Sequence, residues 1–390
     1  FPIAVGLQLG IAALFLNWPA ARSSLDGLNG VVAALEQATQ AGTSFLFGYV
    51  GRSSDMPFEA ADGGGGFFIF AFQALPLLVF ISALAAVLWH WGILKVIIRG
   101  FALFISRVLG TGGAVSLAAS ANVLLGQTEA PLLIRPYLAK LTRSELFAVI
   151  GCGYATVAGT VMVLYGIILS SLSPTMLGHI LVASLISVPA ALIMAQIIVP
   201  PSSGEVSTSS DDVQDGFAYD STMDAFTSGA VEGGKLWANI IIAILAFIAL
   251  AALINIIFDA ALPDVLGAPL TIERIFAWIF APFIWLAGLP ADQVMAGAEL
   301  MGIKTAINEV VAYEALAGLA PDALDERSTL IMVYAMCGFA NIGSLGIVIG
   351  GFTALEPSRR KEVLELAPKA LVAGTLATLS SGAVVGLLWT

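Results

Sequence analysis

Apolar runs long enough to cross a lipid bilayer limit this chain to few architectures. A helix needs about 20 apolar residues to span the hydrocarbon layer, and the runs at 67–91, 177–199 and 236–258 meet that length. Of the 390 residues, 58% are hydrophobic and 11% are charged. We find no alternating strand pattern of the kind that a lipid-facing barrel needs. The sequence therefore predicts an all-α polytopic membrane protein.

Two apolar regions are interrupted by a carboxylate. Residues 126–131 read Gly-Gln-Thr-Glu-Ala-Pro, and the glycine and proline break the helix around Glu129. Asn308 and Glu309 interrupt a second region. A charge at a helix centre in lipid costs about 2.5 to 3.5 kcal/mol, and the free backbone groups of a break need protein, water or a ligand around them. Polar breaks at corresponding positions of two halves indicate the binding site of a secondary transporter.

Basic residues set the orientation of these two regions. Arg107 precedes residues 111–138 and Arg143 follows them, so both ends are predicted to be cytoplasmic and the segment to be a re-entrant hairpin. The run at 359–361, Arg-Arg-Lys, is the strongest cytoplasmic signal. Counting crossings back from it places the ends of a second hairpin, 291–319, outside. Hairpin, broken helix and helix thus occur twice with opposite orientation, as an inverted repeat on a scaffold of spanning helices.

The same pattern predicts the domain organisation. Because the chain opens at Phe1 without a methionine or a basic leader, we expect a preceding segment to be missing. The predicted units are N-terminal scaffold helices with an extramembrane segment (1–92), an interfacial helix (93–110), the first repeat of a transport domain (111–199), an acidic loop (200–224), a long scaffold helix (225–262), a second interfacial helix (263–290) and the second repeat (291–390).

Composition excludes several functions. The net charge of −11 and a pI near 4.6 argue against nucleic-acid binding. Cys152 and Cys337 lie in apolar runs without ligand spacing and are predicted to be packed small residues. His90 and His179 are isolated, so no catalytic pair forms around either glutamate. We expect no organic cofactor.

The candidate site residues are the polar groups near the breaks. Glu129 and Glu309 must be paired, protonated or bound to a ligand. Lys304 and Arg135 are near enough in sequence to form purely structural ion pairs with them, which is the alternative interpretation. Neutral hydrogen-bonding side chains suit sugar hydroxyls and base edges, or otherwise hold helices together. They are Gln127, Thr128, Asn341 and Ser344.

Two further groups are weaker candidates. Asn122 and Thr156, with carbonyls freed at the break after Leu125 and beside Thr156, could form an oxygen cage for a small cation. Phe339 could be a platform for an aromatic ligand, or a core residue.

Four motifs resemble the concentrative nucleoside transporters. They are Gly-Gln-Thr-Glu-Ala-Pro-Leu at 126–132, Thr-Arg-Ser-Glu-Leu-Phe-Ala-Val at 142–149, Asn-Glu-Val-Val-Ala-Tyr at 308–313 and Cys-Gly-Phe-Ala-Asn at 337–341. Looser similarity runs from about 42 to the C-terminus. The missing segment is expected to be the family's first helix.

This resemblance implies a bacterial inner-membrane homotrimer with a mobile transport domain that contains both hairpins. It places Gln127, Thr128 and Glu129 at the nucleobase, with Val161, Leu236 and Phe339 packed on it. It places Glu309, Asn341 and Ser344 at the ribose. Sodium would take the side chains of Asn122 and Thr156 and the carbonyls of Leu125 and Val157.

The sequence thus predicts a sodium-coupled nucleoside symporter that works by elevator-type alternating access. Coupling to protons through a glutamate is the nearest alternative. An intramembrane enzyme with Glu129 and Glu309 as acid and base, or a passive channel, are the others.

Overall fold

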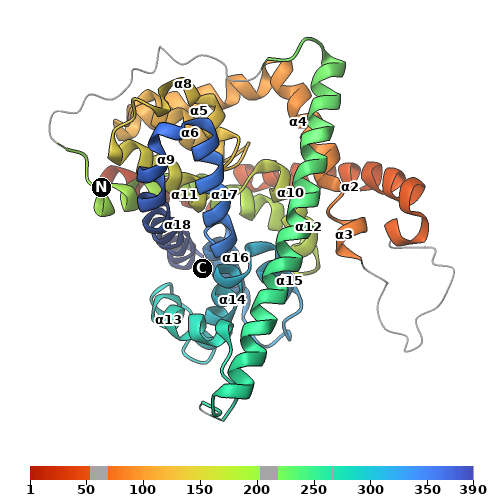
Figure 1. The fold of residues 1–390 in the computed structure, drawn as a ribbon, viewed down its shortest axis with the longest axis vertical. Helices are drawn as coiled ribbons and strands as arrows, with labels where there is room; N and C mark the ends of the chain where they lie inside the picture. The colour runs from red at the N-terminus through yellow and green to blue at the C-terminus, as the bar shows by residue number, and fades with distance from the viewer. Residues whose placement is uncertain (53–68, 203–217, 266, 390) are drawn as a thin grey trace.

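The computed structural model describes residues 1–52, 69–202, 218–265 and 267–389, and every regular element in these ranges is a helix (Figure 1). Within these described ranges, five helical segments are long and apolar enough to cross a membrane. This confirms the predicted all-α polytopic membrane fold. The segments are Phe70–His90, Arg143–Ser171, Met176–Ile198, Thr222–Ala261 and Pro357–Leu388.

The apolar run at 67–91, predicted as one full spanning helix, contains the spanning segment Phe70–His90, but that segment is not one continuous helix. Its described part forms α3 (Phe70–Gln73) and α4 (Leu77–His90), separated at Pro76. Proline has no N–H for a helical hydrogen bond. The break is held by Trp237, whose Nε1 donates to the carbonyl of Ala71 at 2.8 Å. The flanking helices are α1 (Pro2–Asn17), α2 (Pro19–Phe47), the short η1 (Gly48–Gly51) and α5 (Ile93–Leu109).

Helix α12 (Thr222–Ala261) is the longest element and runs diagonally along the molecule in Figure 1. It begins well before the apolar run at 236–258, and its first residues belong to the end of the loop predicted at 200–224. Most of that loop, 203–217, lies outside the described residues. Gly229 and Gly233 let α12 approach α4 closely, because a Cβ on Gly233 would lie 2.7 Å from the Cα of Val79.

The two halves repeat one order of elements. Each half has a hairpin, then a helix broken in its middle, then a long helix. The first is α6 (Gly113–Asn122), α7 (Ala130–Leu133), α8 (Arg135–Leu138), α9 (Arg143–Ala155), α10 (Gly159–Ile168), η2 (Leu169–Ser171) and α11 (Met176–Ile198). The second, after α13 (Ile272–Leu286), is α14 (Val294–Ala306), α15 (Glu309–Ala317), α16 (Glu326–Met336), α17 (Ile342–Leu355), η4 (Pro357–Arg359) and α18 (Arg360–Leu388).

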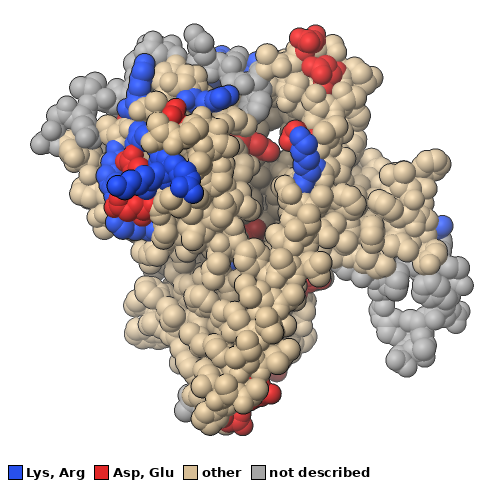
Figure 2. All heavy atoms as spheres, viewed as in Figure 1, with Lys and Arg blue, Asp and Glu red and all other residues tan. Residues whose placement is uncertain are grey.

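The bases of the two hairpins lie at opposite ends of the molecule. Arg359, from the basic run, donates to the carbonyls of Leu138 and Leu141 at 3.1 and 2.7 Å and so joins the base of the first hairpin. Figure 2 shows lysines and arginines gathered at the end that holds α5, α8 and α9 in Figure 1. At the base of the second hairpin, Gln293 instead contacts Asp325 at the start of α16. The hairpins therefore enter the fold from opposite sides.

Candidate functional site

A cavity of about 210 Å³ lies where the tips of both hairpins meet α10, α12 and the break between α16 and α17. Residues from sequence stretches far apart meet here. All of the residues predicted to contact a nucleoside line it: Gln127, Thr128, Glu129, Val161, Leu236, Glu309, Phe339, Asn341 and Ser344.

Glu309 is buried in this cavity and held by neutral donors. The hydroxyl of Tyr165 donates to its Oε1 at 2.7 Å, and Nδ2 of Asn341 donates to its Oε2 at 3.0 Å. Glu309 is also the first residue of α15, where the helix dipole favours a negative charge. The sequence left open an ion pair between Glu309 and Lys304, and this alternative is wrong: their charged groups are not within 4.0 Å of each other. Nζ of Lys304 also makes no hydrogen bond within the described part of the chain.

Both polar breaks of the second half are capped by an asparagine. Oδ1 of Asn308 accepts from the backbone N–H of Val311 at 3.0 Å and starts α15. Oδ1 of Asn341 accepts from the N–H of Ser344 at 2.7 Å and starts α17. Since an N-cap oxygen satisfies a helix's free N–H group, these caps fix the backbone that carries Glu309 and Ser344. The Nδ2 of Asn341 remains available for Glu309.

The tip of the first hairpin is built differently. Gly126 has a φ of +104°, and a Cβ there would lie 2.8 Å from the Cβ of Ala158, so both backbone and space require glycine. The carboxylate of Glu129 lines the cavity but makes no hydrogen bond to a described residue. The predicted alternative of an ion pair with Arg135 is wrong, since that side chain is exposed and has no ion pair with Glu129.

The residues predicted to hold a cation lie just behind this tip. The N–H of Gly159 donates to the carbonyl of Leu124 at 3.0 Å, which joins the hairpin to the break of the α9–α10 helix. Asn122 is fully buried, and its Oδ1 has no hydrogen-bond partner among the described residues. Thr156 donates its hydroxyl to the carbonyl of Cys152, which leaves its oxygen free to accept.

The donor set of this region fits a hard cation. The carbonyls of Leu125 and Val157 lie at the two joined breaks, and no backbone N–H of the described residues donates to them. Such oxygens are the ligands that sodium-like cations prefer. By contrast, the described residues contain no cluster of histidine, cysteine, aspartate and glutamate that could hold a transition metal.

Two residues at the site were missed by sequence reasoning. Tyr165 binds Glu309 from α10, four residues after the predicted Val161 and therefore on the same helix face. That spacing was a usable signal. Phe247 of α12 lines the cavity beside Gly343, where a Cβ would lie 2.7 Å from its ring. Nothing in the local sequence distinguishes Phe247 from other apolar residues of α12.

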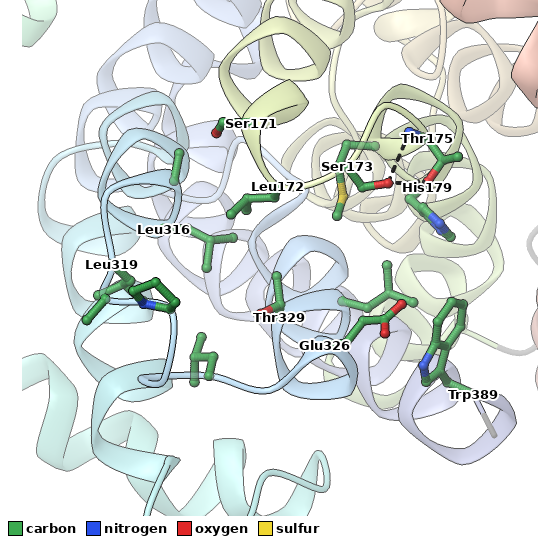
Figure 3. A pocket seen from close by; sticks show the side chains of 16 residues that line it. Ser171, Leu172, Ser173, Thr175, His179, Leu316, Leu319, Glu326, Thr329 and Trp389 are labelled. Atoms are coloured by element: carbon green, nitrogen blue, oxygen red, sulfur yellow. Dashed lines mark hydrogen bonds between the residues drawn. The ribbon is translucent and has the colours of Figure 1, made fainter. Parts of the chain in front are cut away.

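A second, larger hollow of about 720 Å³ lies between η2, the end of α15 and the start of α16 (Figure 3). Hydroxyl groups of Ser173 and Thr175, the ring of His179 and the indole of Trp389 face it, and the centroids of those two rings are 6.2 Å apart. None of the predicted site residues line this hollow. It is therefore separate from the cavity at the hairpin tips.

Comparisons with known families cover most of the chain. Residues 179–386 match the model described as the Na⁺ dependent nucleoside transporter C-terminus. Residues 2–50 match the N-terminus of the same family, and 71–172 match a model described as nucleoside recognition. The chain belongs to the Na⁺ dependent nucleoside transporter family. The resemblance found in the motifs is thereby confirmed.

Relatives and solved structures of this family agree. The nucleoside permease NupC of Helicobacter pylori is 33% identical over 98% of this chain and 89% of its own length. Human solute carrier family 28 member 3 is 34% identical, over 98% of this chain and 55% of its length. The structure of CNTnw in an inward-facing substrate-bound state has 36% identity and a TM-score of 0.87, covering 100% of this chain and 92% of that one. These family members are transporters, and the chain is not an enzyme.

Proposed function

We propose that this protein is a sodium-coupled nucleoside symporter that imports its substrate by elevator-type alternating access. One observation carries the proposal: the polar residues of both hairpin tips and of the α16–α17 break line a single cavity. A nucleoside has two polar ends, a base and a ribose, and this cavity offers hydrogen-bonding groups from two separate sides. Family membership supports the same substrate class.

The two carboxylates would bind different parts of the nucleoside. Glu309, Asn341 and Ser344 would contact the ribose, since a carboxylate accepts strong hydrogen bonds from hydroxyl groups. Gln127, Thr128 and Glu129 would read the base. The apolar side chains of Val161, Leu236 and Phe339 would pack against the base plane.

Sodium would occupy the oxygen ligands of Asn122, Leu125, Thr156 and Val157 behind the first hairpin tip. The unpartnered Oδ1 of Asn122 supports a cation there, because a buried polar atom without a partner is costly. An ion at this place would order the tip that carries Gln127 and Glu129. If sodium raises the affinity for nucleoside, nucleoside must raise the affinity for sodium by the same factor.

Uptake of radiolabelled uridine into proteoliposomes tests this proposal. We expect accumulation under an inward sodium gradient and none under a potassium gradient of equal size. Accumulation that follows a pH gradient and ignores sodium would replace sodium by protons. Glu129 favours this second candidate, because its carboxylate lines the cavity without a hydrogen bond to the described residues. Uptake that never exceeds the external concentration would indicate a channel.

The assembly and location follow the same proposal. Large apolar side chains along α12, including Leu245 and Ile256, are more than 60% exposed, and such a face needs lipid or a partner. We propose a homotrimer in a bacterial inner membrane, with the scaffold at 1–92 and 225–262 holding a transport domain at 111–199 and 291–390. The helices at 93–110 and 263–290 would lie along the membrane surface.

A further inference from the structure

The second hairpin contains a buried pair of opposite charges. Among the residues whose burial is described, one basic and one acidic side chain are buried. Lys304 is the only such lysine or arginine, and Glu309 is the only such aspartate or glutamate. They lie five positions apart, at the end of α14 and the start of α15. The neutral donors of Tyr165 and Asn341 satisfy Glu309, whereas the ammonium of Lys304 has no hydrogen bond to any residue that the structure describes.

This ammonium needs a physical reason to be buried. A buried charge without a partner costs several kcal/mol by desolvation alone. Glu309 is the only buried carboxylate among the residues whose burial is described, and it begins α15 directly after the helix end that carries Lys304. The interaction is electrostatic and does not depend on direct contact, because no ion pair within 4.0 Å is formed. Lys304 therefore offsets the charge of Glu309 without occupying the hydrogen-bonding positions of its carboxylate.

Such an arrangement matters most when the transport domain crosses the membrane without cargo. In the proposed function, on which this inference rests, ribose hydroxyls solvate Glu309 in the loaded domain. The empty domain lacks these donors during its return. We propose that Lys304 is the internal counter-charge of Glu309 and that it allows the empty transport domain to reorient across the membrane.

Comparing two modes of transport tests this role. Net uptake requires the empty domain to return, whereas exchange of labelled for unlabelled nucleoside, with equal sodium on both sides, does not. Both would be measured in proteoliposomes containing the wild-type chain, Lys304→Met or Lys304→Arg. Lys235→Met is the matched control, since Lys235 is 63% exposed and paired with Glu232 on the surface.

We expect Lys304→Met to lower net uptake about tenfold or more and exchange less than about threefold, because the loss of one buried charge leaves the other uncompensated. Lys304→Arg keeps the charge and is expected to retain net uptake within about threefold. The control should behave as wild type in both modes.

Two results would overturn this role. Equal losses in both modes, including the total loss that an unfolded variant gives, would assign Lys304 to the packing of α14. Unchanged net uptake in Lys304→Met would show that Glu309 needs no counter-charge. Failure of the wild-type chain in both modes is a different result, since it would contradict the proposed function itself.

Discussion

The two hairpin tips carry equivalent glutamates in unlike surroundings. In the second hairpin, only Ile307 and Asn308 separate α14 from α15, and Glu309 is fixed by Tyr165 and Asn341. In the first hairpin, the chain between α6 and α7 is longer, and the carboxylate of Glu129 has no hydrogen bond to a described residue. One tip is organised by the protein alone, whereas the other leaves its polar groups open.

This difference suggests a division of work between the hairpins. A preorganised carboxylate binds its ligand without further ordering cost, which suits the ribose that all nucleosides share. A tip that needs an added ion to be ordered makes binding depend on that ion. Coupling would therefore arise at the first hairpin and common recognition at the second.

Neutralising the two glutamates should show the largest effect and the clearest asymmetry. We expect Glu309→Gln to lower the kcat/KM of uridine uptake about 100-fold, because it weakens charge-assisted hydrogen bonds worth about 1.5 to 3 kcal/mol each. Glu129→Gln should cost about tenfold, since a less ordered group contributes less. Uptake kinetics in proteoliposomes measure both. A larger loss for Glu129→Gln than for Glu309→Gln would contradict the view that the second hairpin tip is the better organised one.

Gly126→Ala should disturb the first tip alone. The alanine would have to adopt a φ of +104° and approach Ala158 to 2.8 Å. Backbone strain of about 1 to 3 kcal/mol should displace the tip and reduce uptake about 30-fold, with a higher sodium requirement. Gly350→Ala in α17 is the control, because a Cβ there meets nothing within 4 Å. If both variants need the same sodium concentration for uptake, the first hairpin tip does not take part in sodium coupling.

Thr156→Val tests the oxygen ligands behind the tip. Valine keeps the shape of threonine and removes the hydroxyl, so the sodium concentration for half-maximal uptake should rise about tenfold. Thr156→Ser keeps the hydroxyl and should change it less than about twofold. The measurement is uridine uptake against sodium concentration at constant ionic strength. If the two variants respond alike, the hydroxyl is not a ligand.

Tyr165→Phe weakens the preorganisation of the second tip. Removing the hydroxyl that donates to Glu309 at 2.7 Å should raise the KM for uridine about fivefold, the effect of one hydrogen bond of about 1 kcal/mol. The matched control is Tyr313→Phe. Its ring centroid lies 4.9 Å from that of Tyr165, but its hydroxyl donates to the carbonyl of Val333. An unchanged KM in Tyr165→Phe would mean that Asn341 alone holds Glu309.

The contrast between the tips also separates what the sequence could predict from what it could not. The breaks at 126–131 and at Asn308 were visible because polar residues and helix breakers interrupt apolar runs. The bond between Tyr165 and Glu309 was not, since it joins residues 144 positions apart. Charge alone made Lys304 look like the partner of Glu309, yet the three-dimensional fold supplied neutral donors closer to the carboxylate.

The break at Pro76 shows the same limit in the scaffold. An apolar run long enough to span does not reveal whether a proline will bend its helix or end it, because the outcome depends on neighbouring elements. Here Trp237 of α12 donates to the carbonyl of Ala71, which satisfies one acceptor of the broken segment. That contact depends on the packing of α12 against α4. The spacing of Gly229 and Gly233 indicates close packing against a helix, but it does not identify α4 as that helix.

The smallest expected effect concerns the base of the second hairpin. Asp325 starts α16 by accepting from the N–H of Ser328 at 2.7 Å, and it contacts Gln293 next to α14. The backbone hydrogen bond from Ser328 lowers the pKa of Asp325 below its ordinary value. Its contribution to stability is therefore complete above the pKa of the unfolded chain and is lost as the pH falls through the folded value.

Asp325→Asn should remove this pH dependence and keep the cap, because an asparagine oxygen also accepts from the backbone. The measurement is the melting temperature in detergent between about pH 5 and pH 3, which should fall more for the wild type than for the variant. The underlying difference in the free energy of unfolding is a few tenths of a kcal/mol, as is typical of an exposed group. The base of the first hairpin is instead held by Arg359, whose guanidinium donates to the carbonyls of Leu138 and Leu141. If the melting temperatures of the two proteins fall equally with pH, the stability of the second hairpin does not depend on the charge of Asp325.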